Sequence, residues 1–263
     1  MTQAEPQIKA AFASPLRQFA RRALDVLLPP QCLSCGTLVE EQGALCLECW
    51  QGVTFISQPH CALCGLPFEF SMQGSDFSGG SLCGSCVRQR PVFERARAVL
   101  AYDDASSPFI LTFKHADRTE AAPAFARWMA RAGADVLENA DLIAPVPLHW
   151  SRLFRRRYNQ AALLSQSLSA ISGVPAIPDL LVRKRATPSQ GSFSPSARRR
   201  NVSGAFAVRD KYVQRISDKR VVLVDDVLTT GATASAVTKA LLKAGVGAVD
   251  VLTLGRVLRP FPL

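Results

Sequence analysis

Eight cysteines are the first residues in this sequence whose types and spacing predict chemistry. They form four Cys-x-x-Cys pairs, and a glycine directly follows the first and third pairs, as Gly36 and Gly65. Each pair places two sulfurs on one side of a tight turn, and two pairs complete a tetrahedral four-sulfur site that suits Zn²⁺. The spacing therefore predicts up to two structural zinc ions, held by Cys32, Cys35, Cys46, Cys49, Cys61, Cys64, Cys83 and Cys86.

The spacing leaves the pairing of these four turns open. Consecutive turns can share a metal, or a cross-braced arrangement can join the first turn with the third and the second with the fourth. Disulfides are the alternative to zinc, but they are rare in the cytoplasm, where we expect this chain because its N-terminal residues lack the apolar core of a signal peptide. A redox Cys-x-x-Cys usually occurs once, beside a βαβ pattern. Closed four-cysteine sites are structural, so we expect no catalysis there.

A second group of residues, at 225–233, follows an apolar and mostly β-branched run at 221–224. Two carboxylates come first, and a threonine-rich segment then opens a helix. Backbone amides at a helix start, together with the helix dipole, favour a phosphate, and Gly231 allows it to approach closely. One turn away, the carboxylates can accept hydrogen bonds from ribose hydroxyls. The string predicts a ribose 5-phosphate site made by Asp225, Asp226, Val227, Leu228, Thr229, Thr230, Gly231, Ala232 and Thr233.

The alternative is an ordinary helix that follows a strand, with Asp225 and Asp226 as turn residues. A single Gly-x-Thr would not outweigh that interpretation. The complete order of apolar strand, acid pair and threonine–glycine loop does, because open α/β sheets bind ligands at the carboxyl ends of their strands.

The elements that must position this loop alternate between strand and helix. Apolar runs predict strands at 97–102, 142–146, 221–224 and 249–254. Three- and four-residue periodicity predicts helices at 106–113, 121–132, 159–171 and 234–244. Strands separated by helices are typical of βαβ units with a mainly parallel sheet. We therefore divide the chain into an N-terminal amphipathic helix in residues 1–30, a cysteine-rich module at 31–90 and an α/β domain at 92–263.

Charge is distributed unevenly along the chain. The formal net charge is +10, and residues 151–209 hold eleven basic side chains against one acid, an excess that equals the total. Such an excess favours an anionic partner, although a solvated basic surface is the simpler interpretation. The sequence has no apolar run long enough for a membrane-spanning helix.

The string at 221–233 resembles the phosphoribosyl pyrophosphate loop of type I phosphoribosyltransferases. The whole chain from about Leu27 is similar to the ComF/GntX family, in which zinc ribbons precede a phosphoribosyltransferase domain. One departure is Arg157, where the family usually has glycine. Beyond the loop, the resemblance rests on residues 145–150, on Arg156 with Tyr158-Asn159-Gln160, on Arg183 and Arg185 with residues 187–190, and on residues 199–202 and 204–206.

The resemblance implies a type I phosphoribosyltransferase fold with an N-terminal double zinc ribbon. It also implies that Mg²⁺ binds with the diphosphate of the substrate, and that residues 145–149 face that diphosphate. Residues 183–201 correspond to a hood over the site, from which Arg185, Gln190 and Arg200 are catalytic candidates. Lys114 and His115 match a lysine position of the family that lines the cleft.

Three hypotheses about function follow. The chain is a Mg²⁺-dependent phosphoribosyltransferase of unknown acceptor that uses phosphoribosyl pyrophosphate, in a family linked to DNA uptake. Alternatively, it is a non-catalytic protein that binds a nucleotide or single-stranded DNA with the same pocket and the arginine-rich segment. In the third hypothesis the zinc ribbons dock a protein partner. Salt dependence separates the first two, because a contact with many phosphates weakens steeply with salt.

Overall fold

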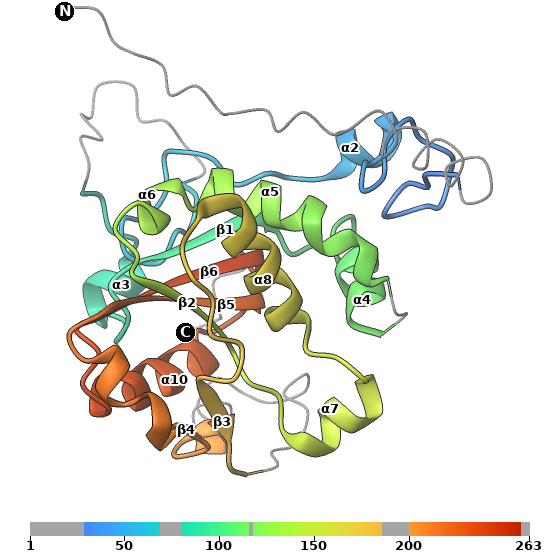
Figure 1. Ribbon diagram of the computed structural model, residues 1–263. Coiled ribbons are helices and arrows are strands. Elements are labelled where there is room, and N and C mark those ends of the chain that lie inside the picture. The colour runs from blue at the N-terminus through green and yellow to red at the C-terminus, as the bar shows by residue number, and fades with distance from the viewer. Residues whose placement is uncertain (1–28, 69–79, 116–117, 186–199, 259–263) are drawn as a thin grey trace, which may run out of the picture.

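The computed structural model describes residues 29–68, 80–115, 118–185 and 200–258. Within these ranges, four parallel strands form one sheet (Figure 1). In spatial order they are β1 (Ala96–Ala101), β6 (Ala248–Arg256), β5 (Arg220–Leu228) and β2 (Leu142–Pro145). Every residue of β1, β2 and β6 is buried, as expected for parallel strands that are covered on both faces. The predicted α/β class with a parallel sheet is confirmed.

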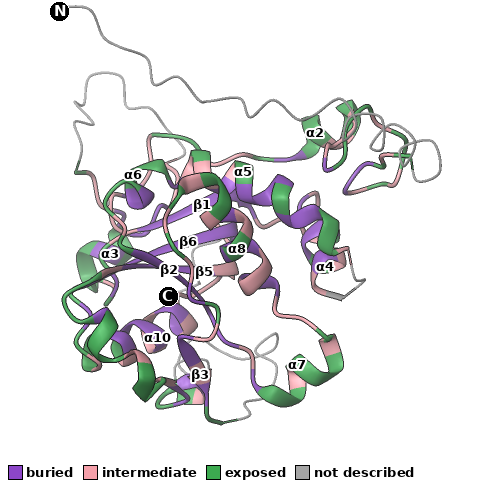
Figure 2. Cartoon of the chain, in the orientation of Figure 1, coloured by how far each residue is buried: buried purple, intermediate pink, exposed green. Residues whose placement is uncertain are grey.

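Other elements cover both faces of this sheet, and Figure 2 shows the buried residues gathered on its strands. Three helices pack on one face, where Phe109, Phe125 and Leu164 meet Val222 of β5. The other face is covered by a helix and a two-stranded hairpin, which bury Val237 and Phe206. The elements are α4 (Ser107–His115), α5 (Ala122–Ala132) and α8 (Gln160–Ser172) on the first face, and α10 (Ala232–Lys243), β3 (Leu181–Arg183) and β4 (Phe206–Val208) on the second.

The predicted strand at 221–224 is too short. β5 continues to Leu228, because its last residues pair with β6 from Thr253 to Arg256. The apolar run ends at Val224 because β2 ends there too, with Pro145 paired to Val224. Beyond that point β5 keeps a neighbour on one side only, and its side chains no longer face a fully apolar core. The acid pair therefore lies within the strand and not in a loop after it.

Several short elements were not predicted. The hairpin strands β3 and β4 have three residues each and pair across a long separation in sequence, which gives no local periodicity to detect. The others are α2 (Leu47–Gly52), α3 (Gly84–Arg88), α6 (Ala134–Leu137) and α7 (Trp150–Arg156). None of the described helices is long and apolar enough to cross a membrane.

The cysteine-rich segment packs along β1, at the edge of the sheet. The Ala96 amide donates to the Leu63 carbonyl at 2.7 Å, and Phe55 forms an isolated antiparallel bridge with Leu100. The ring of Phe55 also lies 5.7 Å from that of Trp128 on α5. The three-part division of the chain stays a prediction, and the expected N-terminal helix falls on residues 1–28, outside the described ranges.

Candidate functional site

The acid pair lies where β5 extends past the end of β2. Asp225 pairs with Thr253 of β6, one residue beyond the last pairing of β5 with β2. Asp225 lines a small hollow at the carboxyl ends of the parallel strands, the usual ligand position in open α/β sheets. The Asp225 carboxylate accepts a hydrogen bond from the Asp226 amide at 2.9 Å, which fixes the orientation of the first acid.

Two cations approach the acid pair from elements far apart in the sequence. Lys114, on the last turn of α4, forms an ion pair with Asp226 at 3.0 Å between Nζ and Oδ1. Both side chains are largely withdrawn from solvent, at 18% and 16% exposure. Arg183 of β3 is buried, with its guanidinium carbon 5.3 Å from the centre of the Phe206 ring, and it attracts Asp225 electrostatically. From the sequence, Lys114 was placed in the cleft only through its match to a family position, and Arg183 was named only as part of a family motif at the start of the hood.

Burial and crowding change the acid–base properties of these groups. Burial, followed by repulsion from Asp226, raises the pKa of Asp225 to about 7. Burial also lowers the pKa of Arg183 to about 10. Burial alone would lower the pKa of Lys114, but attraction to Asp226 outweighs it, and the pKa lies above the ordinary value of lysine. The site therefore holds a charged lysine beside an acid that titrates near neutral pH.

The residues after the acids turn sharply into α10. Gly231 has φ +73°, a left-handed conformation that side chains other than glycine rarely adopt, and it is the N-cap of α10. Gly231 has no side chain to cap the helix, and the Thr230 hydroxyl accepts from the first helix amide, that of Ala232, at 3.3 Å. A hollow of about 20 Å³ lies inside the turn, lined among others by Asp225, Thr229, Thr233 and Thr253. The start of α10 and the threonine hydroxyls therefore lie beside this small hollow, at the helix end that favours an anion.

Residues 158–160 hold the surroundings of the acid pair in place. The Tyr158 hydroxyl donates to the Phe113 carbonyl at 2.7 Å, and the Gln160 amide donates to the Lys114 carbonyl at 3.4 Å, so both fix the end of α4 that carries Lys114. The Asn159 side chain donates to the Val146 carbonyl at 3.1 Å and accepts from the Ala161 amide, which ties the turn after β2 to the start of α8. These residues therefore act as positioning residues for the site.

Residues 145–149 start at this edge of the sheet, but not all of their side chains reach solvent. His149 is buried, and its Nδ1 atom accepts from the Ser151 amide at 3.3 Å as the N-cap of α7. Arg157 ends α7 with φ +66°. The arginine thus adopts the left-handed backbone conformation for which glycine is favoured.

The hood candidates are only partly described. Gln190 lies outside the described residues, and Arg200 is exposed at the start of the returning segment. The Arg185 guanidinium donates to the carbonyls of Asn201 and Ser203, at 3.1 and 3.0 Å, across the hairpin. Arg185 thus links the two sides of the hairpin. Its contact with a substrate stays a prediction.

The eight cysteines form two separate clusters from consecutive turns. In each, one sulfur atom per residue lies within 4.8 Å of the others, so the cross-braced alternative is excluded. Backbone amides also point at the sulfurs, since the Cys46 amide donates to Cys32 and the Cys83 amide to Cys61, both at 3.3 Å. Closed sets of four thiolates fit structural Zn²⁺. The clusters are Cys32, Cys35, Cys46 and Cys49, and Cys61, Cys64, Cys83 and Cys86.

Comparisons with known proteins agree with this architecture. The model of a double zinc ribbon domain matches residues 23–87, and that of a phosphoribosyl transferase domain matches residues 159–256. Competence protein F of Haemophilus influenzae is 32% identical over 235 residues, which cover 86% of this chain and 96% of the relative. The chain belongs to the ComF family.

Other relatives of this ComF-family protein carry related names. DNA utilization protein YhgH of Escherichia coli K12 is 34% identical over 75% of this chain and 84% of its own, and competence protein ComFC of Bacillus subtilis is 25% identical over 83% and 87%. Among solved structures, an allosteric regulatory enzyme of purine biosynthesis aligns with 55% of this chain and 30% of its own, at 19% identity and a TM-score of 0.36. That last likeness is too distant to support an argument.

Proposed function

We propose that this ComF-family protein binds phosphoribosyl pyrophosphate, or a related nucleotide-like ligand, at residues 225–233. The observation that carries the proposal is the adjacent acid pair beyond the end of β2, in a strand that leads through the threonine–glycine turn to the start of α10. The two carboxylates can accept hydrogen bonds from the two ribose hydroxyls. The 5-phosphate then lies against the amides and hydroxyls of Thr229, Thr230 and Thr233, at the positive end of the α10 dipole.

The charges around the acids support a ligand that carries a diphosphate. Lys114 is charged and turned to Asp226, and an incoming diphosphate offers it further oxygen partners. The raised pKa of Asp225 supports the same view, because a hard cation bound with the ligand would relieve the repulsion between the acids. Mg²⁺ prefers carboxylate and phosphate oxygens, and Asp225 and Asp226 are the residues of the site that fit it. When bound, it would neutralise the charge that develops on the leaving diphosphate.

We further propose that the bound ligand is a substrate for transfer of the phosphoribosyl group to an acceptor. The tasks of the chain in such a reaction are to orient the sugar, neutralise charge and exclude water. Arg185, Gln190 and Arg200 remain the candidates to close over the phosphates, since guanidinium groups bind phosphate oxygens in pairs. The acceptor stays open.

Calorimetric titration with phosphoribosyl pyrophosphate and MgCl₂ tests the binding proposal. We expect saturable heat for the unaltered protein and none for the Asp225→Ala/Asp226→Ala variant, with unchanged heat for Asp210→Ala, which removes an exposed acid elsewhere. Equal binding by all three proteins would refute the pocket. Release of pyrophosphate with a panel of nucleobases and amines then tests transfer, and its complete absence would leave the protein as a binding protein.

A second function, binding of single-stranded DNA, is supported by the surface of α7. Trp150 and Phe154 lie one helical turn apart and are 73% and 87% exposed, which is unusual for aromatic side chains of this size. Arg152, Arg155 and Arg156 belong to the same helix. Aromatic faces interleaved with arginines suit stacking of bases beside a phosphate backbone. The relatives' names, which refer to competence and DNA utilization, point the same way.

Fluorescence anisotropy with labelled oligo(dT) of about 20 nucleotides tests this second function. We expect Trp150→Ala/Phe154→Ala to weaken binding by about 10-fold or more, since each stacked base contributes about 1–3 kcal/mol. Ile171→Ala, which removes an exposed apolar side chain outside α7, is the control. A flat dependence of the affinity on salt, or equal affinity of all variants, would rule out α7 as a DNA platform.

The first zinc ribbon supports a third proposal, a protein partner. It exposes Leu38 and Leu47 at 65% and 72% of their surface. A cytoplasmic location stays a prediction, and it fits thiols that must remain reduced to hold zinc.

A further inference from the structure

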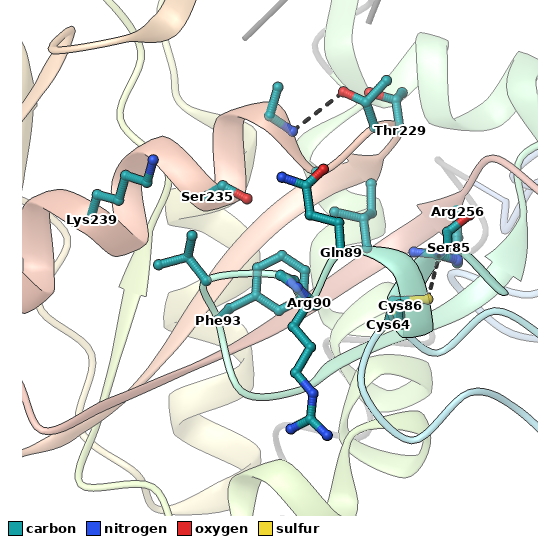
Figure 3. Close-up of a pocket in the computed structure, with 16 residues that line it drawn as sticks. Cys64, Ser85, Cys86, Gln89, Arg90, Phe93, Thr229, Ser235, Lys239 and Arg256 are labelled. Carbon is teal, nitrogen blue, oxygen red and sulfur yellow. Dashed lines mark hydrogen bonds between the residues drawn. The ribbon is translucent and has the colours of Figure 1, made fainter. Parts of the chain in front are cut away.

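A cavity of about 310 Å³ lies between the second cysteine cluster and the outer side of the turn at residues 228–232 (Figure 3). Its walls come from the segment 89–93, which leads from the ribbon into β1, and from Ser235 and Lys239 on α10. Asp225, Asp226, Lys114 and Arg183 do not line it, so it is distinct from the surroundings of the acid pair, although it shares the turn at residues 229–232 with the proposed phosphate site. We propose that this cavity binds a second ligand, a nucleotide whose phosphate lies at the Lys239 end.

The walls match such a ligand in charge and polarity. None of the described residues that line the cavity is acidic, while Arg90, Lys239 and Arg256 are basic. Pro91, Phe93 and Leu228 supply apolar surface for a planar base. A volume of about 310 Å³ lies at the lower end of the range of small-molecule sites and suits a mononucleotide.

The charges at the two ends of the cavity indicate where the phosphate of the nucleotide lies. Figure 3 shows Cys64, Cys86 and Arg256 together at one end, and Ser235 with Lys239 toward the other. At the cysteine end, Arg256 already donates to the Cys64 sulfur at 3.2 Å. The negative charge of the thiolates there offsets the positive charge of this arginine. Lys239 is exposed, and no such thiolate lies beside it at its own end. The phosphate therefore belongs near Lys239, one turn along α10 from Ser235.

The two ligands would share one structural element. Thr229, Thr230 and Gly231 line the cavity and also belong to the turn proposed to hold the sugar phosphate. A ligand that orders this turn from outside lowers the conformational cost of ordering it from inside. We expect the two sites to be coupled, so that each ligand changes the affinity of the other by the same factor.

Calorimetry on the zinc-loaded full-length protein tests the proposal with AMP, GMP, CMP, UMP and inorganic phosphate, each alone. We expect at least one nucleotide to bind the Asp225→Ala/Asp226→Ala variant as well as the unaltered protein. Lys239→Glu should weaken that binding by about 10-fold or more, the loss typical of a charge-assisted hydrogen bond. Lys243→Glu makes the same change one turn further along α10, outside this cavity, and should change it less than about twofold.

The outcomes separate this site from the acid pair. If no nucleotide binds the Asp225→Ala/Asp226→Ala variant, the cavity is not a nucleotide site, whatever phosphoribosyl pyrophosphate does. Equal weakening by Lys239→Glu and Lys243→Glu would assign the effect to the general charge of α10 and overturn the proposal. If a nucleotide does bind the cavity, a saturating concentration of it should shift the affinity of the unaltered protein for phosphoribosyl pyrophosphate by about 5-fold or more. An unchanged affinity would refute the coupling.

Discussion

Asp225→Asn is expected to stabilise the protein while it removes a ligand contact. Burial and the neighbouring Asp226 raise the pKa of Asp225 to about 7 from an ordinary value near 3.8. At about 1.4 kcal/mol per pKa unit, the ionised carboxylate costs the folded state at most about 4 kcal/mol. Asp225 is partly exposed, and solvent screening reduces this cost to about 1–3 kcal/mol. Asparagine keeps the shape and removes the charge.

The size of this stabilisation depends on pH in a defined way. The folded protein binds the Asp225 proton more tightly than the unfolded chain does, so the penalty is absent below about pH 4. It grows between about pH 4 and pH 7 and is complete above pH 7. Asp225→Asn should therefore raise the melting temperature by roughly 3–10 °C at pH 8 and by about a quarter of that at pH 4.5.

The adjacent acid provides a control with the opposite sign. Asp226→Asn breaks the 3.0 Å ion pair and leaves the largely buried Lys114 ammonium without that partner. We expect a loss of about 1–2 kcal/mol, less than for a fully buried pair because both side chains keep some solvent contact. The assay is thermal unfolding of zinc-loaded protein, followed by circular dichroism from pH 4.5 to 8. The same direction of change for both variants would refute the electrostatic argument.

Other expectations concern affinity, backbone and metal. Because Asp225 must be ionised to accept hydrogen bonds or face Mg²⁺, affinity for phosphoribosyl pyrophosphate should rise by up to about 10-fold per pH unit below pH 7 and level off above it, measured by calorimetry. Gly65→Ala places a methyl carbon 2.5 Å from the Ala96 carbonyl oxygen at φ +65° and should cost about 2–4 kcal/mol in thermal unfolding. Gly36→Ala, with φ +79° and open space among the described residues, should cost only about 1–2 kcal/mol; equal losses would contradict the packing. Arg157→Gly should raise stability by up to about 1 kcal/mol, and a loss would show that the arginine side chain matters more than its φ of +66°. Atomic emission should find about two zinc ions per chain, and strong chelation should remove the folded signal, which a stable metal-free protein would contradict.

The sequence predicts the sheet well, because its strands are continuous apolar runs and its helices carry clear periodicity. The helix at 121–132, with Pro123 in its first turn and Gly133 just past its end, matches α5 closely. The end of β5 could not be placed in the same way, because it depends on where β2 stops. A strand that outlasts one neighbour keeps its backbone pairing while its side chains become polar, as Asp225 shows.

The loop of the candidate site could be predicted from the sequence, but the basic residues that face its acids could not. Residues 225–233 form a local sequence signal. Lys114 on α4 and Arg183 on β3 are distant in sequence and come near the acids only through the tertiary fold. Tyr158 and Gln160 could be matched to the family, but their role in holding α4 depends on a contact between α4 and α8. The pairing of the cysteine turns was likewise open, because spacing alone allows both arrangements and only the path of the chain decides.

The second cysteine cluster is joined to the proposed ligand site by a short series of contacts. Arg256 donates to the Cys64 sulfur and stands opposite Leu228 in the β5–β6 pairing, directly before the turn into α10. Leu63 accepts from the Ala96 amide, so the same ribbon also fixes the start of β1. The first cluster meets the domain elsewhere, because Leu33 and Val53 belong to the core cluster of Phe109, and Trp50 and Phe55 contact Trp128 on α5. Zinc in the second cluster would fix the Cys64 sulfur that accepts from Arg256 beside the turn, so its loss should weaken phosphate binding, whereas loss from the first cluster should act mainly through stability.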